Sequence, residues 1–260
     1  MGHINCETGF IGRNYKWLDE IDSTNSLMRR MLMDEDIAEG LMLIADHQDA
    51  GRGRSGHTWS SPVGSSIALS VLLRPDVDEN SIPIVTLVTA LAVAKAIHTL
   101  HNIDVAIKWP NDIIVGGKKV CGILTELDLS RGVKSLIVGV GINANQESFP
   151  DEIKDVATSI KMITGKDCDR ERLVECFAAC LEEYYKAFLK SGNMTELIDE
   201  YNSLLINIDR EVKVLDPSEN ITGIAKGIDE LGQLLVETDD KVTHHIYAGE
   251  VSVRGIYGYV

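Results

Sequence analysis

The chain has 260 residues, a length that suits one large domain or one large and one small domain. Hydrophobic residues make up 44% of the chain and charged residues 25%, as in soluble globular proteins, and the net charge of −15 argues against broad electrostatic binding to nucleic acid or anionic membranes. No basic region followed by an apolar core opens the chain, and the apolar runs break well short of the roughly 20 residues of a membrane span, so neither a secretory signal nor a spanning helix is expected.

The cysteines and histidines form no metal-binding or disulfide pattern. The cysteines are odd in number and lack C-x-x-C spacing, so we expect reduced thiols in a cytoplasmic protein rather than a disulfide framework or a zinc site. Cys176 and Cys180 stand one helical turn apart, which is typical of packed helix residues. His244 and His245 lack a third nearby ligand.

Hydrophobic patterning predicts strands and helices in a mixed order. Strands are expected, in chain order, over 15–21, 41–45, 66–73, 105–109, 113–115, 118–126 and 136–140. Helices are expected over 26–31, 82–100, 170–191 and 194–205, the first of them after the capping residues at 22–25. Gly116 and Gly117 predict a β-hairpin turn, so the sheet is expected to be mixed or antiparallel.

The character of the chain changes after Ile206. Four short strands punctuated by turns are expected over 212–215, 221–225, 234–237 and 242–247, and together they predict a small all-β barrel of about 55 residues. We therefore predict an α+β protein with a larger domain over 1–206 and a small domain over 207–260, joined by a packed junction rather than a flexible tether.

A basic, glycine-rich stretch at 51–62 stands out in this acidic chain. Three glycines alternate there with Arg52 and Arg54, and Trp59 follows directly. Glycine lets backbone N–H groups approach a ligand closely, and arginine forks suit phosphate or carboxylate, while an indole can cover a flat ring. A basic surface turn could have the same composition, but a local basic cluster in an acidic chain favours an anion-binding loop. The stretch matches neither a Walker A loop nor the dinucleotide fingerprint.

Further polar residues end strands or occupy turns, where rigid strands commonly support functional loops. The set has an excess of cations and contains no Ser-His-Asp or Cys-His arrangement, so it suits chemistry that needs anion neutralisation and alignment, such as attack on a phosphate. Its members are Gln48, Arg52, Arg54, Asn111, Asp112, Lys118, Lys119 and Asn143.

Four motifs occur in the order found in biotin protein ligases, and the chain resembles that family over nearly its whole length. The closing stretch Gly249-Glu250-Val251-Ser252-Val253-Arg254 is also similar to the family's C-terminal domain. The resemblance implies a catalytic domain like that of class II synthetases and an SH3-like C-terminal β-barrel. The motifs are Gly51-Arg52-Gly53-Arg54-x-Gly-x-x-Trp59-x-Ser-Pro62, Lys108-Trp109-Pro110-Asn111-Asp112, Lys119-x-x-Gly122-Ile123-Leu124-x-Glu126 and Gly139-Val140-Gly141-Ile142-Asn143.

The resemblance implies a reaction in two steps with ATP and Mg²⁺. The carboxylate of biotin attacks the α-phosphate of ATP to give biotinyl-5′-AMP and pyrophosphate, and the ε-amine of a lysine on a biotin carrier domain, as in a biotin-dependent carboxylase, then displaces AMP. The implied catalytic residues are Lys119, Arg52 and Arg54.

The resemblance also implies two sets of binding residues. Those for biotin are Ser23, Thr24, Asn25, Gln48, Arg52, Gly53, Arg54, Lys119, Gly122 and Leu124. Those for ATP are Arg54, Trp59, Asn111, Lys119, Asn143 and Arg254, with Trp59 and Asn143 holding the adenine. Asp112 is the expected magnesium-side carboxylate, although the sequence does not fix that assignment.

Two departures from the family pattern bear on function. The family often has arginines around the positions of Ser55 and His57, so the loop carries less charge here. Only 14 residues precede the first expected strand, whereas a DNA-binding helix-turn-helix domain needs roughly 50 or more, so we expect a ligase without repressor function or nucleic-acid partner.

Two other functions stay open on the sequence. Lipoate ligases and lipoyl transferases share the implied fold and adenylate chemistry but use a different loop and acyl slot, which the Arg52-Gly53-Arg54 loop disfavours. A non-catalytic biotin or nucleotide sensor is the second alternative, and intact Lys119, Arg54 and Asn143 argue against it. The sequence does not decide whether the chain forms a homodimer through an exposed sheet edge.

Overall fold

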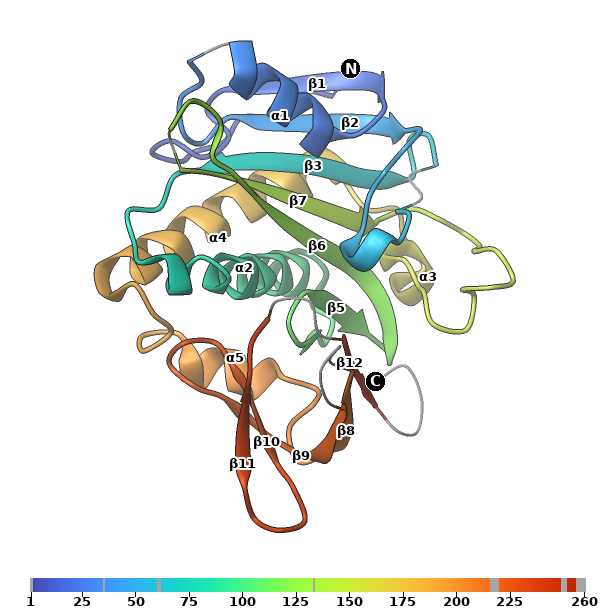
Figure 1. Cartoon of the computed structure of the whole chain (residues 1–260). Coiled ribbons are helices and arrows are strands. Elements are labelled where there is room, and N and C mark those ends of the chain that lie inside the picture. Colours follow the sequence, from blue (N-terminus) through green and yellow to red (C-terminus); the bar gives the residue numbers. More distant parts are fainter. Residues whose placement is uncertain are drawn as a thin grey trace.

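The computed structural model describes residues 2–34, 36–59, 62–132, 134–215, 220–248 and 252–255. It contains a seven-stranded sheet, a five-stranded sheet and helices packed on the larger sheet (Figure 1), so the predicted α+β class with a small C-terminal β domain is confirmed. The helices are α1 (Thr24–Asp34), α2 (Ile84–His101), α3 (Ile160–Thr164), α4 (Arg170–Ser191) and α5 (Ile198–Leu204), with short 3-10 turns η1 (Arg54–Gly56), η2 (Glu79–Ser81) and η3 (Ser130–Gly132).

The larger sheet has the order β1-β2-β3-β7-β6-β5-β4. Its β1 and β2 are parallel because α1 crosses between them, and its other neighbouring pairs are antiparallel, so the sheet is mixed as predicted. The strands are β1 (Tyr15–Ile21), β2 (Met42–Gln48), β3 (Ser66–Leu73), β4 (Ala106–Lys108), β5 (Asp112–Val115), β6 (Lys118–Asp128) and β7 (Ser135–Asn143).

Both faces of the larger sheet are covered, which explains why its central strands are apolar at nearly every position. Leu43, Leu72 and Ile137 pack with the buried side of α1 in one cluster. Their neighbours along the same strands belong to the main core with α2 and α4, because successive side chains point to opposite faces. Helix α1 therefore covers one face of the sheet, while α2 and α4 pack together on the other.

The helical stretch Glu79–His101 corrects the expectation that no apolar run is long enough to cross a membrane. By length and composition alone it could do so, but 67% of its most apolar window is buried inside the protein. It ends at Asn102, whose left-handed backbone (φ 50°) caps the last turn. The stretch is thus the core helix of this fold.

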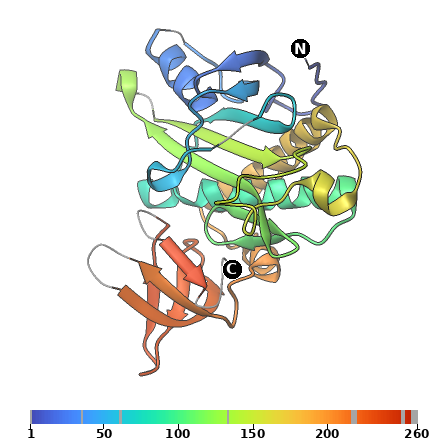
Figure 2. The same ribbon diagram turned by 90° about the vertical axis from the view of Figure 1, so that its right-hand side faces the viewer.

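The smaller sheet has the order β11-β10-β9-β8-β12 and lies against one end of the larger body (Figure 2). The indole Nε1 of Trp109 donates to the carbonyl of Gly232 at 3.0 Å, and α5 contacts both β4 and β9, so the two parts are packed together. The boundary at 206/207 stays a prediction. The strands are β8 (Glu211–Leu215), β9 (Asn220–Ile228), β10 (Leu234–Glu237), β11 (Thr243–Ile246) and β12 (Ser252–Gly255).

The segment before β1 is fastened to α4 by one buried carboxylate. Glu182 accepts hydrogen bonds from the backbone N–H groups of Gly9, Phe10 and Ile11 at 2.7, 2.9 and 3.1 Å, and also pairs with Lys186. Burial acts to raise the pKa of Glu182, but the hydrogen bonds outweigh it and lower this pKa to about 2.

Replacing Glu182 by glutamine is expected to lower the free energy of unfolding at pH 7 by about 2 kcal/mol, because buried N–H groups lose a charged acceptor. Since its folded-state pKa of about 2 is below the ordinary 4.5, the contribution of Glu182 is present above about pH 4.5 and is lost as the pH falls toward 2. Urea unfolding of both proteins at pH 7 and pH 3 should show a smaller difference at pH 3. The exposed neighbour variant Glu183→Gln serves as the control, and an unchanged difference at the two pH values would refute this role.

Candidate active site

The glycine and arginine loop folds back on itself beside the larger sheet. The N–H of Gly53 donates to the carbonyl of His57 at 2.7 Å, and the N–H of Trp59 donates to the carbonyl of Gly51 at 2.8 Å. A Cβ at Gly51 would collide with the carbonyl of Trp59, so only glycine allows this closure. The 3-10 turn η1 forms the tip, and the loop presents Arg52, Arg54 and Trp59 toward the sheet.

One cavity gathers most of the residues that the sequence predicts to bind ligand. Its volume is about 50 Å³, room for a few water molecules, so a larger ligand can enter only if part of the lining moves. The loop supplies much of that lining. The predicted residues that line the cavity are Ser23, Thr24, Asn25, Gln48, Arg52, Gly53, Arg54, Trp59, Asn111, Lys119, Gly122 and Leu124, and they are joined by Leu69, Ile123, Gly139, Val140 and Gly141.

A chain of hydrogen bonds forms the polar end of the cavity. Thr24 donates to Gln48 Oε1 from its backbone N–H at 2.8 Å and from its hydroxyl at 3.1 Å. The buried Ser70 hydroxyl lies 2.7 Å from Thr24 Oγ1 and 2.5 Å from Asn25 Oδ1, which fixes both side chains. Ser23 precedes the first turn of α1 and also lines the cavity, so capping and ligand binding are compatible roles for it.

Ser70 is a site residue that the sequence did not reveal. It lies on β3 in an apolar run, where a single serine is ordinarily interpreted as a packing residue without a role in the site. A signal was nevertheless present, because a serine buried in a central strand needs a hydrogen-bond partner.

Glycines on two neighbouring strands make room for the Trp59 ring. Gly122 on β6 faces Gly141 on β7 in the sheet register. A Cβ at Gly141 would collide with the Trp59 indole, and one at Gly122 would lie 3.1 Å from both Trp59 and Lys119. A Cβ at Gly139 would likewise collide with the Asn25 side chain. The Gly-x-Gly spacing at 139–141 was the available signal, since residues two apart share one face of a strand.

Lys119 stands at the other end of the cavity. Its Nζ lies 2.6 Å from Asp112 Oδ1 and 5.7 Å from the centroid of the Trp59 ring. Both partners of the ion pair are largely shielded, with side-chain exposures of 26% and 14%. The pair holds an ammonium group at the cavity wall, and a phosphate or carboxylate that entered would meet it there.

Arg54 links the loop to two other parts of the chain. Its Nη1 donates to Asn111 Oδ1 at 3.1 Å and its Nη2 to the carbonyl of Ala248, beyond β11, at 3.2 Å. Burial lowers the pKa of the Arg54 guanidinium, and the nearby Asp112 carboxylate opposes this shift. A partly desolvated cation of this kind favours the arrival of an anion.

Three residues of the predicted biotin, ATP and magnesium sets do not line the cavity, and neither does Lys118. The Asn143 amide is buried and bonds Thr158 and Gln146 instead, at 3.1 and 3.0 Å. Arg254 lies on β12, and its side chain, like Ser61 of the loop motif, falls outside the described residues. Asp112 pairs with Lys119, which does line the cavity. Within the described part of the chain no three His, Cys, Asp or Glu residues group to hold a metal ion, so the magnesium assignment stays a prediction.

A second, wider cavity of about 1070 Å³ opens beside the same loop. Arg52, Gly53 and Arg54 line both cavities, so the loop lies between them. We call the first, narrow cavity the slot and the second one the broad cavity. Leu127, which is 45% exposed, also lines the broad cavity.

Comparison with known proteins agrees with this arrangement. The model of the biotin/lipoate A/B protein ligase family matches residues 17–143, and that of the biotin protein ligase C-terminal domain matches residues 208–254. The bifunctional ligase/repressor BirA of Bacillus spizizenii is 36% identical over 95% of this chain and 76% of its own length. The biotin–[acetyl-CoA-carboxylase] ligase of Mycobacterium tuberculosis is 31% identical over 92% of this chain and 90% of its own length.

A solved structure gives the same result in three dimensions. The biotin protein ligase of Aquifex aeolicus, solved in complex with biotin and ATP, superposes with a TM-score of 0.84 at 37% identity and covers 94% of this chain and 99% of its own. Sequence relatives, both domain models and the fold all agree, and this chain belongs to the biotin protein ligase family.

Proposed function

We propose that this chain catalyses the ATP-dependent biotinylation of one lysine on a biotin carrier domain, with biotinyl-5′-AMP as the intermediate. The observation that carries the proposal is one slot that Lys119, Arg52 and Arg54 line together with the hydrogen-bonded pair Thr24 and Gln48. A molecule with a polar ring at one end and a carboxylate at the other matches this distribution of groups. Biotin has both features.

In the first step a carboxylate oxygen of biotin forms a bond to the α-phosphorus of ATP, and the bond from that phosphorus to the pyrophosphate oxygen breaks. Two anions must come together, so the positive charge of Lys119, Arg52 and Arg54 lowers the barrier. Trp59 offers a flat face for the adenine. The loop also keeps water from the mixed anhydride, which would hydrolyse if it were exposed to solvent.

Magnesium fits this site as an ion that arrives with ATP. Magnesium usually needs only one or two protein carboxylates in addition to substrate phosphates, and Asp112 is a carboxylate beside the cavity. An ion held there would supply positive charge that offsets part of the charge of the phosphates. We therefore keep Asp112 as the proposed magnesium-side residue.

In the second step the nitrogen of a carrier lysine attacks the acyl carbon, AMP leaves with the bonding electrons, and the amine loses its proton. The broad cavity beside the loop gives such a side chain a route to the adenylate, and this supports a folded protein as the acceptor.

All five cysteines are free thiols, which suits the proposed cytoplasmic location. A homodimer through a sheet edge stays open and can be tested by sedimentation.

The proposal is tested by biotin-dependent pyrophosphate release, with lipoate as a parallel substrate and a biotin carrier domain added last. Release with biotin, followed by transfer of biotin to the carrier lysine, is the expected result. Release with lipoate alone would instead support a lipoate ligase, and biotin binding without release would support a sensor.

A further inference from the structure

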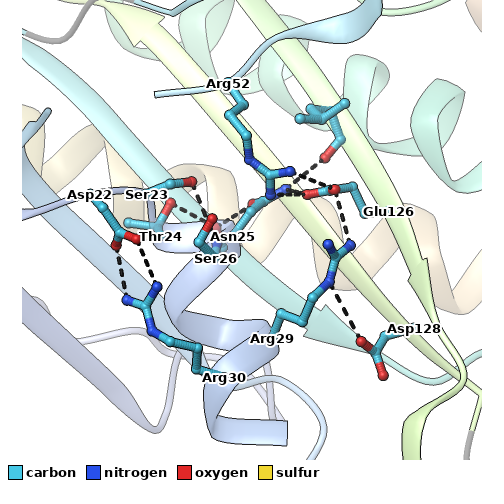
Figure 3. A network of polar contacts seen from close by, with 12 residues as sticks. Asp22, Ser23, Thr24, Asn25, Ser26, Arg29, Arg30, Arg52, Glu126 and Asp128 are labelled. Atoms are coloured by element: carbon cyan, nitrogen blue, oxygen red, sulfur yellow. Dashed lines mark hydrogen bonds and ion pairs between the residues drawn. The ribbon is translucent and has the colours of Figure 1, made fainter. Parts of the chain in front are cut away.

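A single carboxylate ties the arginine loop to the polar end of the slot. Glu126 lies on β6 in the same row as Gly122 and Leu124, because alternate residues of a strand share a face. Both of those residues line the slot, and Glu126 continues their row beyond it. Figure 3 shows Arg52 from the loop and Arg29 from α1 pointing toward the Glu126 carboxylate.

The pairing of Glu126 with Arg52 is bidentate. Arg52 Nη1 donates to Oε1 at 3.1 Å and Nη2 donates to Oε2 at 2.7 Å. Fork-to-fork geometry of this kind is stronger and more directional than a single contact. The Glu126 side chain is 17% exposed and the Arg52 side chain 39%, so the carboxylate is the shielded partner and solvent still reaches the guanidinium.

Two further donors fill the remaining capacity of the carboxylate. Asn25 Nδ2 donates to Oε2 at 2.8 Å, and Arg29 Nη2 donates to Oε1 at 3.0 Å. The bond from Asn25 sets the orientation of its amide, since the amide oxygen then faces the Ser70 hydroxyl. Glu126 thus fixes one residue of the loop and one residue of the slot at the same time.

Arg52 keeps donors for a ligand while it is held. A guanidinium has five N–H groups, and the bidentate pair with Glu126 uses two of them. The carboxylate therefore does not have to release Arg52 before Arg52 contacts a substrate. It instead restricts the conformations of the loop, so less conformational entropy is lost when the substrate binds.

We infer that Glu126 is a positioning residue that holds Arg52 over the slot and sets the amide of Asn25, so that biotin meets a preformed polar end. The inference rests on the proposed function, because it names how the biotin site is assembled. Glu126 does not line the slot itself but bonds Arg52 and Asn25, which do, so it should affect binding of biotin more than the chemical step.

The test measures biotin affinity by titration calorimetry and the KM and kcat of biotin-dependent pyrophosphate release. Replacing Glu126 by alanine is expected to raise the Kd and the KM for biotin about tenfold or more, with a smaller change in kcat. The isosteric Glu126→Gln keeps one acceptor oxygen and should lie between the wild type and Glu126→Ala. It also carries the test if the alanine variant does not fold.

A double-mutant cycle separates positioning from general stability. If Glu126 acts through Arg52, the Arg52→Ala and Glu126→Ala double variant should resemble Arg52→Ala alone more than the product of the two losses. Arg30→Ala is the matched control, because Arg30 on α1 forms a bidentate pair, at 2.7 and 2.9 Å, with Asp22 just before that helix, and among the described contacts it bonds neither the loop nor Glu126. It should leave the Kd for biotin within about twofold.

Two results would overturn the inference. The first is a wild-type Kd for biotin in both Glu126 variants, and the second is a pair of losses that multiply fully in the double variant. Failure of the proposed function looks different, since the wild-type chain would then release no pyrophosphate with biotin. Calorimetry with biotin would still decide the role of Glu126 in that case.

Discussion

Replacing Lys119 by alanine is expected to lower the rate of biotin-dependent pyrophosphate release by about 100- to 1000-fold. Lys119 places its ammonium group at the end of the slot, where negative charge accumulates as the biotin carboxylate approaches the α-phosphate. Its loss would also remove the ion pair with Asp112, now 2.6 Å from Lys119 Nζ, so the negative charge of that carboxylate would oppose an incoming polyphosphate more strongly. Both effects raise the same barrier.

Lys118 provides a control of the same residue type one position away. Its Nζ is turned outward and donates to the carbonyl of Lys154 at 2.9 Å, so Lys118→Ala should leave the rate within about twofold. Single-turnover pyrophosphate release at saturating biotin and ATP compares the two variants without interference from product release. Equal rates for the wild type and Lys119→Ala would exclude Lys119 from the first step.

The double variant Lys119→Ala with Asp112→Asn adds a further comparison. If part of the loss comes from the negative charge of Asp112 that Lys119 no longer balances, removing that charge should recover some activity relative to Lys119→Ala. No recovery would assign the whole effect to the missing ammonium group. This comparison also informs on magnesium, because loss of a metal-side carboxylate would lower activity further.

Residues with distinctive chemistry could be predicted from the sequence. Arg52, Arg54 and Lys119 are cations in an acidic chain, and Trp59 is a rare residue next to a glycine-rich turn. Such residues carry their function in their own side chains, so local patterns and a family resemblance identify them. The structure brings these four together in one cavity.

Roles that depend on contacts between distant strands could not be predicted in the same way. Glu126 belongs to a motif, yet its four hydrogen bonds come from three residues on two separate segments, α1 and the arginine loop, and the sequence gives no measure of that. Gly139 and Gly141 matter because of the side chains that fill the space above them. These roles arise only when β6 and β7 are paired in their actual register.

The secondary structure shows the same difference between local signals, which the sequence contains, and long-range pairing, which it does not. Helix α4 has the predicted limits, because Asp169 caps its start and Gly192, with a left-handed backbone (φ 69°), ends it. The short helix α3 was missed, since five residues are too few to show periodicity. Strand β7 runs to Asn143 rather than to 140, because Gly141 weakens the strand pattern although it pairs with Gly122.

Replacing Arg54 by glycine is expected to let the adenylate escape before it is transferred. Arg54 is the only loop arginine with a described bond to the C-terminal part of the chain, through the carbonyl of Ala248, and it also holds Asn111. Glycine would remove both bonds and a cation that faces the phosphate, and it would free the backbone at the tip of the loop. We expect biotinyl-AMP to dissociate at least about tenfold faster.

The escape can be measured by trapping released biotinyl-AMP with a free amine such as hydroxylamine, at a fixed concentration of biotin and ATP. The Arg54→Gly variant should modify the free amine faster than the wild type while it still releases pyrophosphate. His57→Ala is the loop control, because that side chain is exposed and only the backbone of His57 bonds Gly53. If the trapped product does not rise in Arg54→Gly, then Arg54 does not retain the adenylate, and closure of the slot has to come from Arg52 and its bond to Glu126.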